Sequence, residues 1–505
     1  MPLTRRSFLK VSAGAAVTSI GLEAMTDPSS DGTCQKLAAD PLRPQYHLLP
    51  AHNWMNDPNG PIFYRGRYHM FHQYNPQGAT WGNMNWAHAT SPDMIHWRHE
   101  PVALSPTPGG PDQDGVFSGS AVMHQGKPTL LYTGVQPPRS DSEATLRDGV
   151  HSWRETQCLA EAADDDLRTW KKAPQPVIAS PPAGLEVTGF RDPCLWREDD
   201  RWMMVVGSGI RNKGGAILLY SSPDLRNWSY LHPLIEGSFS GKQSVNPVDT
   251  GDMWECPDFF SVGGKHVLLI STMGKVRWKV GTYAHQRFTS EREGVVDWGS
   301  YYAAKTMLDR DGNRILWGWI PETRPDAALI AAGWAGVMSL PRVISLSSQN
   351  DLQTEVSSAA KILRGTHTRV HGNEINTLRI HDLAAELNLQ IQAKGGEFTL
   401  RLYSDNGDFA SIVCSNRSGS RELSVDKIKA PIAGDVESPV DLHMFLDGSV
   451  LEICANETTF ATARVYRVPS GVLRTKLEGN AEISSADLWP MKPISPNRLT
   501  DPICS

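Results

Sequence analysis

Residues 61–74 read PIFYRGRYHMFHQY, two apolar segments that meet at Arg65-Gly66. Glycine adopts left-handed turn conformations without steric strain, and two strand-like runs around such a turn are typical of a β-hairpin. The same arrangement occurs four more times, roughly every 50 to 75 residues, at 120–134, 193–207, 257–271 and 305–319, with turns at Gln125-Gly126, Asp199-Asp200, Gly263-Gly264 and Asp311-Gly312. One supersecondary unit therefore recurs along the chain.

A second repeat lies between these hairpins. It reads SPDMIHW at 91–97, DDDLRTW at 164–170 and SPDLRNW at 222–228, with an Asp, an apolar residue and a Trp at matching offsets. Repeats of this period that consist of strands indicate a β-propeller, and five hairpins predict five blades. An array of β-sandwiches is the alternative, but it would not explain why a single hairpin type recurs.

The pattern changes after about residue 350. Residues 351–365 are compatible with a short helix and a linker, and residues 387–392, 398–403 and 441–456 alternate between apolar and polar side chains. Such alternation is typical of strands in an antiparallel sandwich. The sequence therefore predicts an all-β protein, with a five-bladed propeller at 44–350 and a C-terminal β-sandwich at 366–495.

Composition excludes several classes of partner. The chain has 505 residues and a net charge of −6, and no basic stripe is present, which argues against nucleic acid and anionic membranes as partners. Its seven cysteines are scattered without a C-x-x-C pair, so a zinc site is not expected. Their odd number does not resemble a disulfide framework.

The N-terminus resembles a twin-arginine export signal. Arg5-Arg6 precede Ser7, and a weakly apolar run, too short for a membrane anchor, covers residues 11–22. We therefore expect residues 1–30 to be a signal and leader, and the mature protein to lie in the periplasm or outside the cell without a membrane segment. An ordinary basic N-terminus is the alternative.

Three acids stand at similar positions before different hairpins. Asp57 precedes the first hairpin, Asp192 the third and Glu255 the fourth. The first strand of each propeller blade lines the central axis, so these side chains should converge at one mouth of the channel. Converging acids suit glycosidic cleavage, which needs a proton donor and an anion beside the reacting carbon. Taken singly, each acid could belong to a surface turn, a structural ion pair or a strand start.

Six motifs in order resemble glycoside hydrolase family 32, the family of invertases, levanases, inulinases and fructan exohydrolases. They are WMNDPNG (54–60), FSGSAV (117–122), FRDP (190–193), WECPDFF (254–260), DWGSYYAAKT (297–306) and ILWGW (315–319). The resemblance runs from about residue 44 to the C-terminus and covers nearly all of the expected mature chain. It implies a five-bladed propeller followed by a β-sandwich, in agreement with the hairpin count.

The resemblance also implies roles for individual residues. Asp57 would be the nucleophile, Glu255 the general acid/base and Asp192 the stabiliser of the transition state, with retention of the anomeric configuration and carboxyl groups about 5–5.5 Å apart. The implied substrate-binding residues are Asn56, Gln73, Trp81, Phe117, Ser118 and Arg191. Arg191 is also expected to hold the adjacent Asp192. Trp54, Trp254 and Trp319 are either aromatic walls or core residues. No cofactor or metal is implied.

The expected substrate is a β-fructofuranoside: sucrose, a fructo-oligosaccharide, levan or inulin. The motifs are similar to those of plant acid invertases and fructan exohydrolases, but residues 271–283 lack the acidic residue found in plant enzymes that prefer sucrose, which favours fructans or mixed substrates. Three other readings stay open. They are a fructosyltransferase that uses the same acids, an inverting glycosidase, and a sugar-binding propeller without activity.

Overall fold

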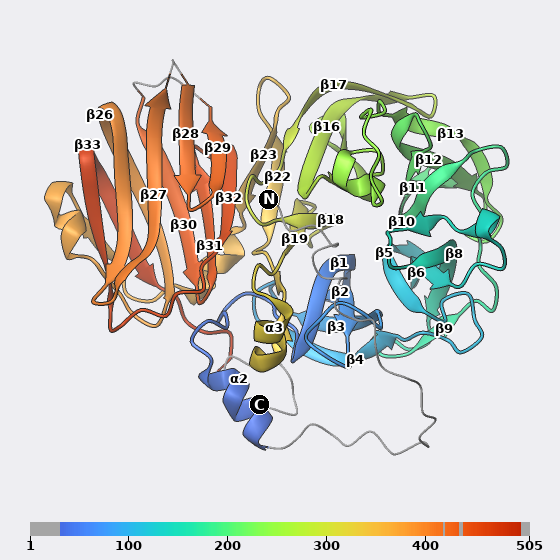
Figure 1. Ribbon diagram of the computed structural model, residues 1–505, viewed down its shortest axis with the longest axis horizontal. Coiled ribbons are helices and arrows are strands. Elements are labelled where there is room, and N and C mark those ends of the chain that lie inside the picture. The colour runs from blue at the N-terminus through green and yellow to red at the C-terminus, as the bar shows by residue number, and fades with distance from the viewer. Residues whose placement is uncertain (1–30, 418–419, 434–437, 496–505) are drawn as a thin grey trace.

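The computed structural model describes residues 31–417, 420–433 and 438–495, and the expected signal at 1–30 lies outside this part of the chain. The described residues form a ring of sheets and, beside it, a second all-β unit (Figure 1). Within them, no helix has the length and apolar character that a bilayer crossing requires. The two α-helices with bounds in this part are α2 (Asp31–Ala39) and α3 (Asp326–Ala332).

All five predicted hairpins are confirmed. The inner strands of the five blades are β1 (Asn53–Tyr64), β5 (Gly115–His124), β10 (Val187–Glu198), β14 (Glu255–Val262) and β18 (Tyr302–Leu308). Each pairs antiparallel with the strand that follows its turn, namely β2 (Arg67–Asn75), β6 (Lys127–Gln136), β11 (Arg201–Ile210), β15 (Lys265–Thr272) and β19 (Arg314–Ile320). At the first turn Arg65 and Gly66 have φ values of 47° and 76°, the left-handed conformation that the sequence indicates.

The outer strands complete each blade. They are β3 (Asn85–Ser91) and β4 (Arg98–Leu104); β7 (Leu146–Arg147), β8 (Ser152–Ala162) and β9 (Trp170–Lys172); β12 (Gly214–Ser222) and β13 (Ser229–Glu236); β16 (Lys275–Ala284) and β17 (Arg287–Val295); β22 (Arg342–Leu346) and β23 (Leu352–Val356). After the fifth inner hairpin, β20 (Trp334–Ala335) pairs with β1 and β21 (Val337–Met338) pairs with β19. This shared pairing ties the last blade to the first and closes the ring.

The second repeat forms the corners between the third and fourth strands of the first three blades. Asp93, Asp164 and Asp224 accept hydrogen bonds from backbone N–H groups two to five residues later. The apolar residue inside each of these turns is buried with a positive φ of 58° to 68°, at Met94, Leu167 and Leu225. The Asp side chain thus stabilises a turn that places an apolar side chain under the blade edge.

Blades are apolar on both faces because each lies between two others. On β11, Met204 and Val206 pack with residues of the second blade, whereas Met203 and Val205 pack with residues of the fourth. Continuous apolar runs, rather than alternation, therefore mark the middle strands. The repeated stacking of blades places the five inner strands around one axis.

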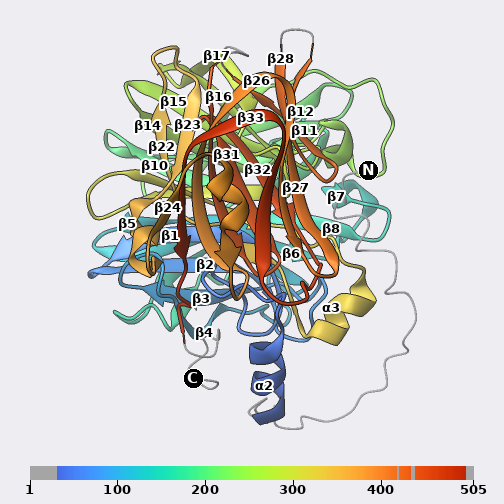
Figure 2. The same ribbon diagram turned by 90° about the vertical axis from the view of Figure 1, so that its left-hand side faces the viewer.

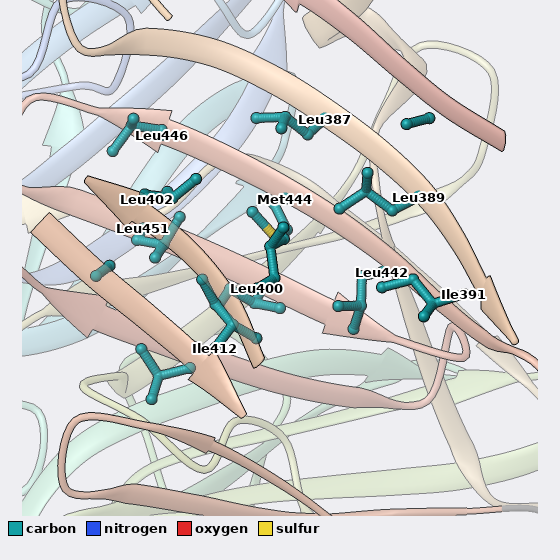
Figure 3. Close-up of a cluster of buried hydrophobic side chains, with 14 of the residues drawn as sticks. Leu387, Leu389, Ile391, Leu400, Leu402, Ile412, Leu442, Met444, Leu446 and Leu451 are labelled. Carbon is teal, nitrogen blue, oxygen red and sulfur yellow. The ribbon is translucent and has the colours of Figure 1, made fainter. Parts of the chain in front are cut away.

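The C-terminal unit is the expected sandwich-like sheet, and Figure 2 shows it from the side that faces away from the ring. Its strands are β24 (Thr368–Val370), β25 (Arg379–Ile380), β26 (Ala384–Ser404), β27 (Gly407–Arg417), β28 (Ser420–Val425), β29 (Ile428–Ile432), β30 (Val440–Asp447), β31 (Val450–Ala455), β32 (Thr459–Arg464) and β33 (Leu473–Pro490). Alternate side chains of β26 and β30, including Leu387, Leu389, Leu442 and Met444, meet in its core (Figure 3).

Two local predictions differ from the structure. Residues 387–392 and 398–403 belong to the single strand β26, because both halves pair with β33 across a register shift between Ala393 and Phe398. Residues 351–365 contain β23 and the 3₁₀ turn Ser358–Leu363 rather than an α-helix. Ser357 caps this turn by accepting a hydrogen bond from the backbone N–H of Ala359.

Candidate active site

The three predicted acids meet at one end of the central channel. Cys256, next to Glu255 on β14, connects the other two: its Sγ lies 3.5 Å from Oδ2 of Asp57 and 3.4 Å from Oδ2 of Asp192. The backbone N–H of Cys256 also donates to Oδ2 of Asp192 at 2.9 Å. Acids from β1, β10 and β14, remote in the sequence, therefore share one site, as predicted.

A break in the strand pairing occurs at this site in every blade. The register of the inner hairpins shifts between Met55 and Pro58, Phe117 and Gly119, Arg191 and Cys194, Glu255 and Asp258, and Tyr302 and Lys305. A bulge bends its strand and redirects side chains, and proline cannot donate to the strand ladder. The Pro residues after Asp57, Asp192 and Cys256 are the sequence signal that sequence reasoning did not use.

Asp57 is held by donors on both oxygens. Asn56 Nδ2 donates to Oδ1 at 3.0 Å, and Ser118 Oγ donates to Oδ2 at 2.6 Å. Trp54 Nε1 in turn donates to Oδ1 of Asn56 at 2.7 Å, which fixes the orientation of the amide. These contacts fix the carboxylate of the expected nucleophile at the channel end and confirm the expectation that Asn56 lies beside it as a donor.

Side chains from two other blades donate hydrogen bonds to Glu255. Arg191 donates from Nε and Nη2 to Oε1 at 3.0 and 2.9 Å, and Tyr302 donates from its hydroxyl to Oε2 at 2.8 Å. Nη1 of Arg191 also donates to Oε1 of Glu155 at 2.8 Å, so the guanidinium contacts Glu255 and Glu155, whereas the expectation that Arg191 holds Asp192 stays a prediction. The strand bulges directly after Arg191, where Asp192 adopts a φ of 66° and its backbone N–H donates to Oγ1 of Thr133.

The other predicted binding residues line or support the same mouth. Trp81, Phe117, Arg191 and Glu255 line one cavity together with Trp153, Thr188 and Asn246, which sequence reasoning missed. The rings of Trp81 and Trp153 approach Phe117 edge-on, at 6.0 and 5.6 Å between centroids. Gln73 is buried and donates to the carbonyl of Val116, so it positions the strand before Phe117.

Trp54, Trp254 and Trp319, which the sequence allowed to be either aromatic walls or core residues, divide into two groups. The rings of Trp54 and Trp319 meet edge-on, with 5.8 Å between their centroids. They belong to a buried cluster with Tyr302 and Cys256, so they pack against residues of the site. Trp254 packs instead between the third and fourth blades. All three are buried.

Comparisons with known proteins agree with this geometry. Residues 47–355 match the model of the glycosyl hydrolases family 32 N-terminal domain, and residues 346–490 match the family 32 C-terminal model. The sequence is 34% identical over 465 residues to a sucrose-6-phosphate hydrolase of Escherichia coli, which covers 84% of this chain and 90% of that protein.

Solved structures show the same likeness. Fructan 1-exohydrolase IIa of Cichorium intybus superposes with a TM-score of 0.76 at 28% identity, over 90% of this chain and 98% of that chain. A β-fructofuranosidase mutant of Bombyx mori, solved in complex with sucrose, superposes with a TM-score of 0.74 at 26% identity, over 93% and 98% of the two chains. The chain therefore belongs to glycoside hydrolase family 32 and is a glycoside hydrolase that acts on β-fructofuranosides.

Proposed function

We propose that the protein releases fructose from β-fructofuranosides by double displacement, with Asp57 as nucleophile and Glu255 as acid/base. The observation that carries this proposal is the placement of both carboxylates at one channel end, each held by its own donors. A retaining glycosidase needs two such groups with different tasks, about 5–5.5 Å apart.

In the first step an Asp57 oxygen attacks C2 of the fructosyl unit while Glu255 gives its proton to the glycosidic oxygen. The bond between C2 and that oxygen breaks, and the leaving sugar departs as an alcohol. In the second step ionised Glu255 takes a proton from water, whose oxygen attacks C2 and displaces Asp57. Asp192, held by Cys256, would bind sugar hydroxyls as charge develops on the ring.

Asp57→Asn tests this assignment because the two side chains have the same shape. We expect fructose release to fall by at least about a thousandfold with an unchanged melting temperature, since the amide cannot form the covalent intermediate. NMR of the first product should show β-fructofuranose. Wild-type rates in the variant, or an inverted anomer, would overturn the mechanism.

We further propose that the protein acts outside the cytoplasm on sucrose and short fructans. The support is the twin-arginine pattern at Arg5-Arg6, the disulfide-bonded state of Cys34, and the likeness to a fructan exohydrolase solved with 1-kestose. Incubation with sucrose, 1-kestose, levan and inulin should give fructose as the growing product from each. Longer oligosaccharides from concentrated sucrose would instead indicate fructosyl transfer.

Export has its own test. Replacement of both Arg5 and Arg6 by Lys should leave the protein in the cytoplasmic fraction with full activity in lysates. Activity that still reaches the periplasm or the medium would contradict the twin-arginine assignment.

A further inference from the structure

Glu155 is a buried carboxylate that contacts Arg191, which in turn contacts the proposed acid/base Glu255. It lies on β8, the third strand of the second blade, and is 0% exposed. Its Oε1 accepts a hydrogen bond from Nη1 of Arg191 at 2.8 Å. Its Oε2 accepts from Thr145 Oγ1 at 2.9 Å and from the backbone N–H of Phe190 at 2.7 Å.

These contacts satisfy both oxygens of Glu155 with donors. Burial of a carboxylate is strongly unfavourable unless a cation and hydrogen bonds compensate it, and Arg191, Thr145 and Phe190 supply both. The backbone N–H of Phe190 comes from the residue directly before Arg191, so Glu155 fixes the main chain as well as the guanidinium. Glu155 is thereby held in place as the second carboxylate partner of Arg191.

Arg191 divides its donors between two carboxylates. Nε and Nη2 point at Glu255, and Nη1 points at Glu155 on the opposite edge of the guanidinium. A cation that faced Glu255 alone would favour its ionised form, which is the wrong form for a proton donor. A second carboxylate on the same cation offsets that effect.

We propose that Glu155 is a positioning residue that keeps Glu255 able to hold its proton at the working pH, by compensating the positive charge of Arg191. The proposal rests on the function above, in which Glu255 must be protonated when the glycosidic bond breaks. Glu155 touches no reacting atom and acts only through Arg191.

Other charged and titratable groups surround Glu155, Arg191 and Glu255, and they stay unchanged when Glu155 is replaced. Asp57 on β1 and Asp192 on β10 lie on one side, with the Cys256 thiol between them. Tyr302 contacts Glu255 from β18, and buried Lys305 on the same strand donates to the carbonyl of Pro257. Arg147 and Asp148 line the cavity at its rim, and Arg154 neighbours Glu155 on β8.

The test is the pH dependence of kcat/KM for sucrose hydrolysis in Glu155→Gln. The alkaline limb of this profile reports the pKa of the essential acid in the free enzyme. Loss of the Glu155 charge strengthens the effect of Arg191 on Glu255, so the limb should move to lower pH by about one unit. Activity above the wild-type limb should then fall roughly tenfold, while activity on the acid side changes little.

Glu161→Gln is the matched control. Glu161 lies on the same strand and pairs with Arg226 at 2.8 Å at the molecular surface, so the same charge is removed without contact to Arg191. Its profile should coincide with that of the wild type. A limb that moves equally in both variants would show a general charge effect and overturn the proposal.

Glu155→Asp provides a second variant in case Glu155→Gln does not fold. The shorter side chain keeps the charge but withdraws it from Arg191, so the limb should move in the same direction by less. An unshifted limb in either folded variant would overturn the role of Glu155 and leave the assignment of Asp57 and Glu255 intact. Absence of fructose release by the wild type would instead refute the proposed function.

Discussion

The thiol of Cys256 lies 3.5 Å from Oδ2 of Asp57, although the two residues are 199 positions apart in the sequence. Burial, and then the charges of Asp192 and Asp57, raise the pKa of this thiol well above its ordinary value. It therefore keeps its proton, which can be donated to either of the two carboxylates at the channel end. Cys256 thus links Asp57, the proposed nucleophile, to Asp192, the proposed stabiliser of the transition state.

Removal of this thiol should weaken catalysis without unfolding the protein. In Cys256→Ala the two carboxylates lose a weak donor, and we expect kcat/KM to fall about three- to tenfold, equivalent to roughly 1 kcal/mol. Cys256→Ser restores a donor and should recover most of the activity. Equal rates in wild type and Cys256→Ala, measured with the same melting temperature, would show that the thiol only fills space.

The blades were predictable because their signals are local. An apolar pair of segments around a Gly or Asp turn specifies each inner hairpin, and the Asp of the second repeat specifies the corner of a blade. Because the hairpins repeat, acids before different hairpins could be placed at one channel end. Asp57, Asp192 and Glu255 therefore emerged from the sequence, with motif resemblance supplying their separate roles.

The partners of these acids were less predictable, because they depend on bulges and on side chains from other blades. Arg191 adjoins Asp192 in sequence but reaches Glu255, since the strand bulges directly after it. Glu155 belongs to no motif and lies on a third strand, so only the folded structure brings it to Arg191. The Asp-Pro and Cys-Pro pairs could have indicated the bulges, but not the contacts that the bulges create.

The stability of the protein should decrease between neutral and alkaline pH because of His47. This ring is buried between Asp447 and Glu452, at 2.7 and 2.9 Å. Burial alone lowers its pKa, but the hydrogen bonds to the two acids outweigh burial and raise the pKa to about 9. A pKa raised in the folded state stabilises the protein fully below about pH 6.5 and loses that contribution as pH rises through 9.

Urea unfolding at pH 6, 7.5 and 9 measures this effect. Between pH 6 and pH 9 the free energy of unfolding of the wild type should fall by about 3 kcal/mol more than that of His47→Gln, since one pKa unit corresponds to about 1.4 kcal/mol. His96, half-exposed and paired with Asp93, offers the control variant His96→Gln, which should follow the wild-type curve. Parallel curves for wild type and His47→Gln would contradict the prediction.

Arg342 should be essential for the attachment of the C-terminal unit. Its guanidinium is fully buried, pairs with Asp297 of the propeller and Glu452 of the sandwich, and lies over the ring of Phe460. Arg342→Met leaves the buried carboxylate of Asp297 without its cation and leaves Glu452 with His47 alone, which should destabilise the protein by about 3–5 kcal/mol. Arg292→Met removes an exposed pair with Asp351 and should change stability by less than about 1 kcal/mol. Similar unfolding midpoints for the two variants would refute the argument.

A methyl group at Gly119 should disturb Ser118, the donor to Asp57. A Cβ at this position would lie 2.0 Å from the carbonyl oxygen of Leu131, a backbone atom that cannot move aside without displacing the bulge. We expect Gly119→Ala to destabilise the protein by about 1–3 kcal/mol and to lower kcat more than about tenfold, since Ser118 would shift away from Asp57, the proposed nucleophile. Gly78→Ala has open space around its Cβ and should match the wild type in both measurements. A stable and fully active Gly119→Ala enzyme would show that the bulge is not needed to place this donor.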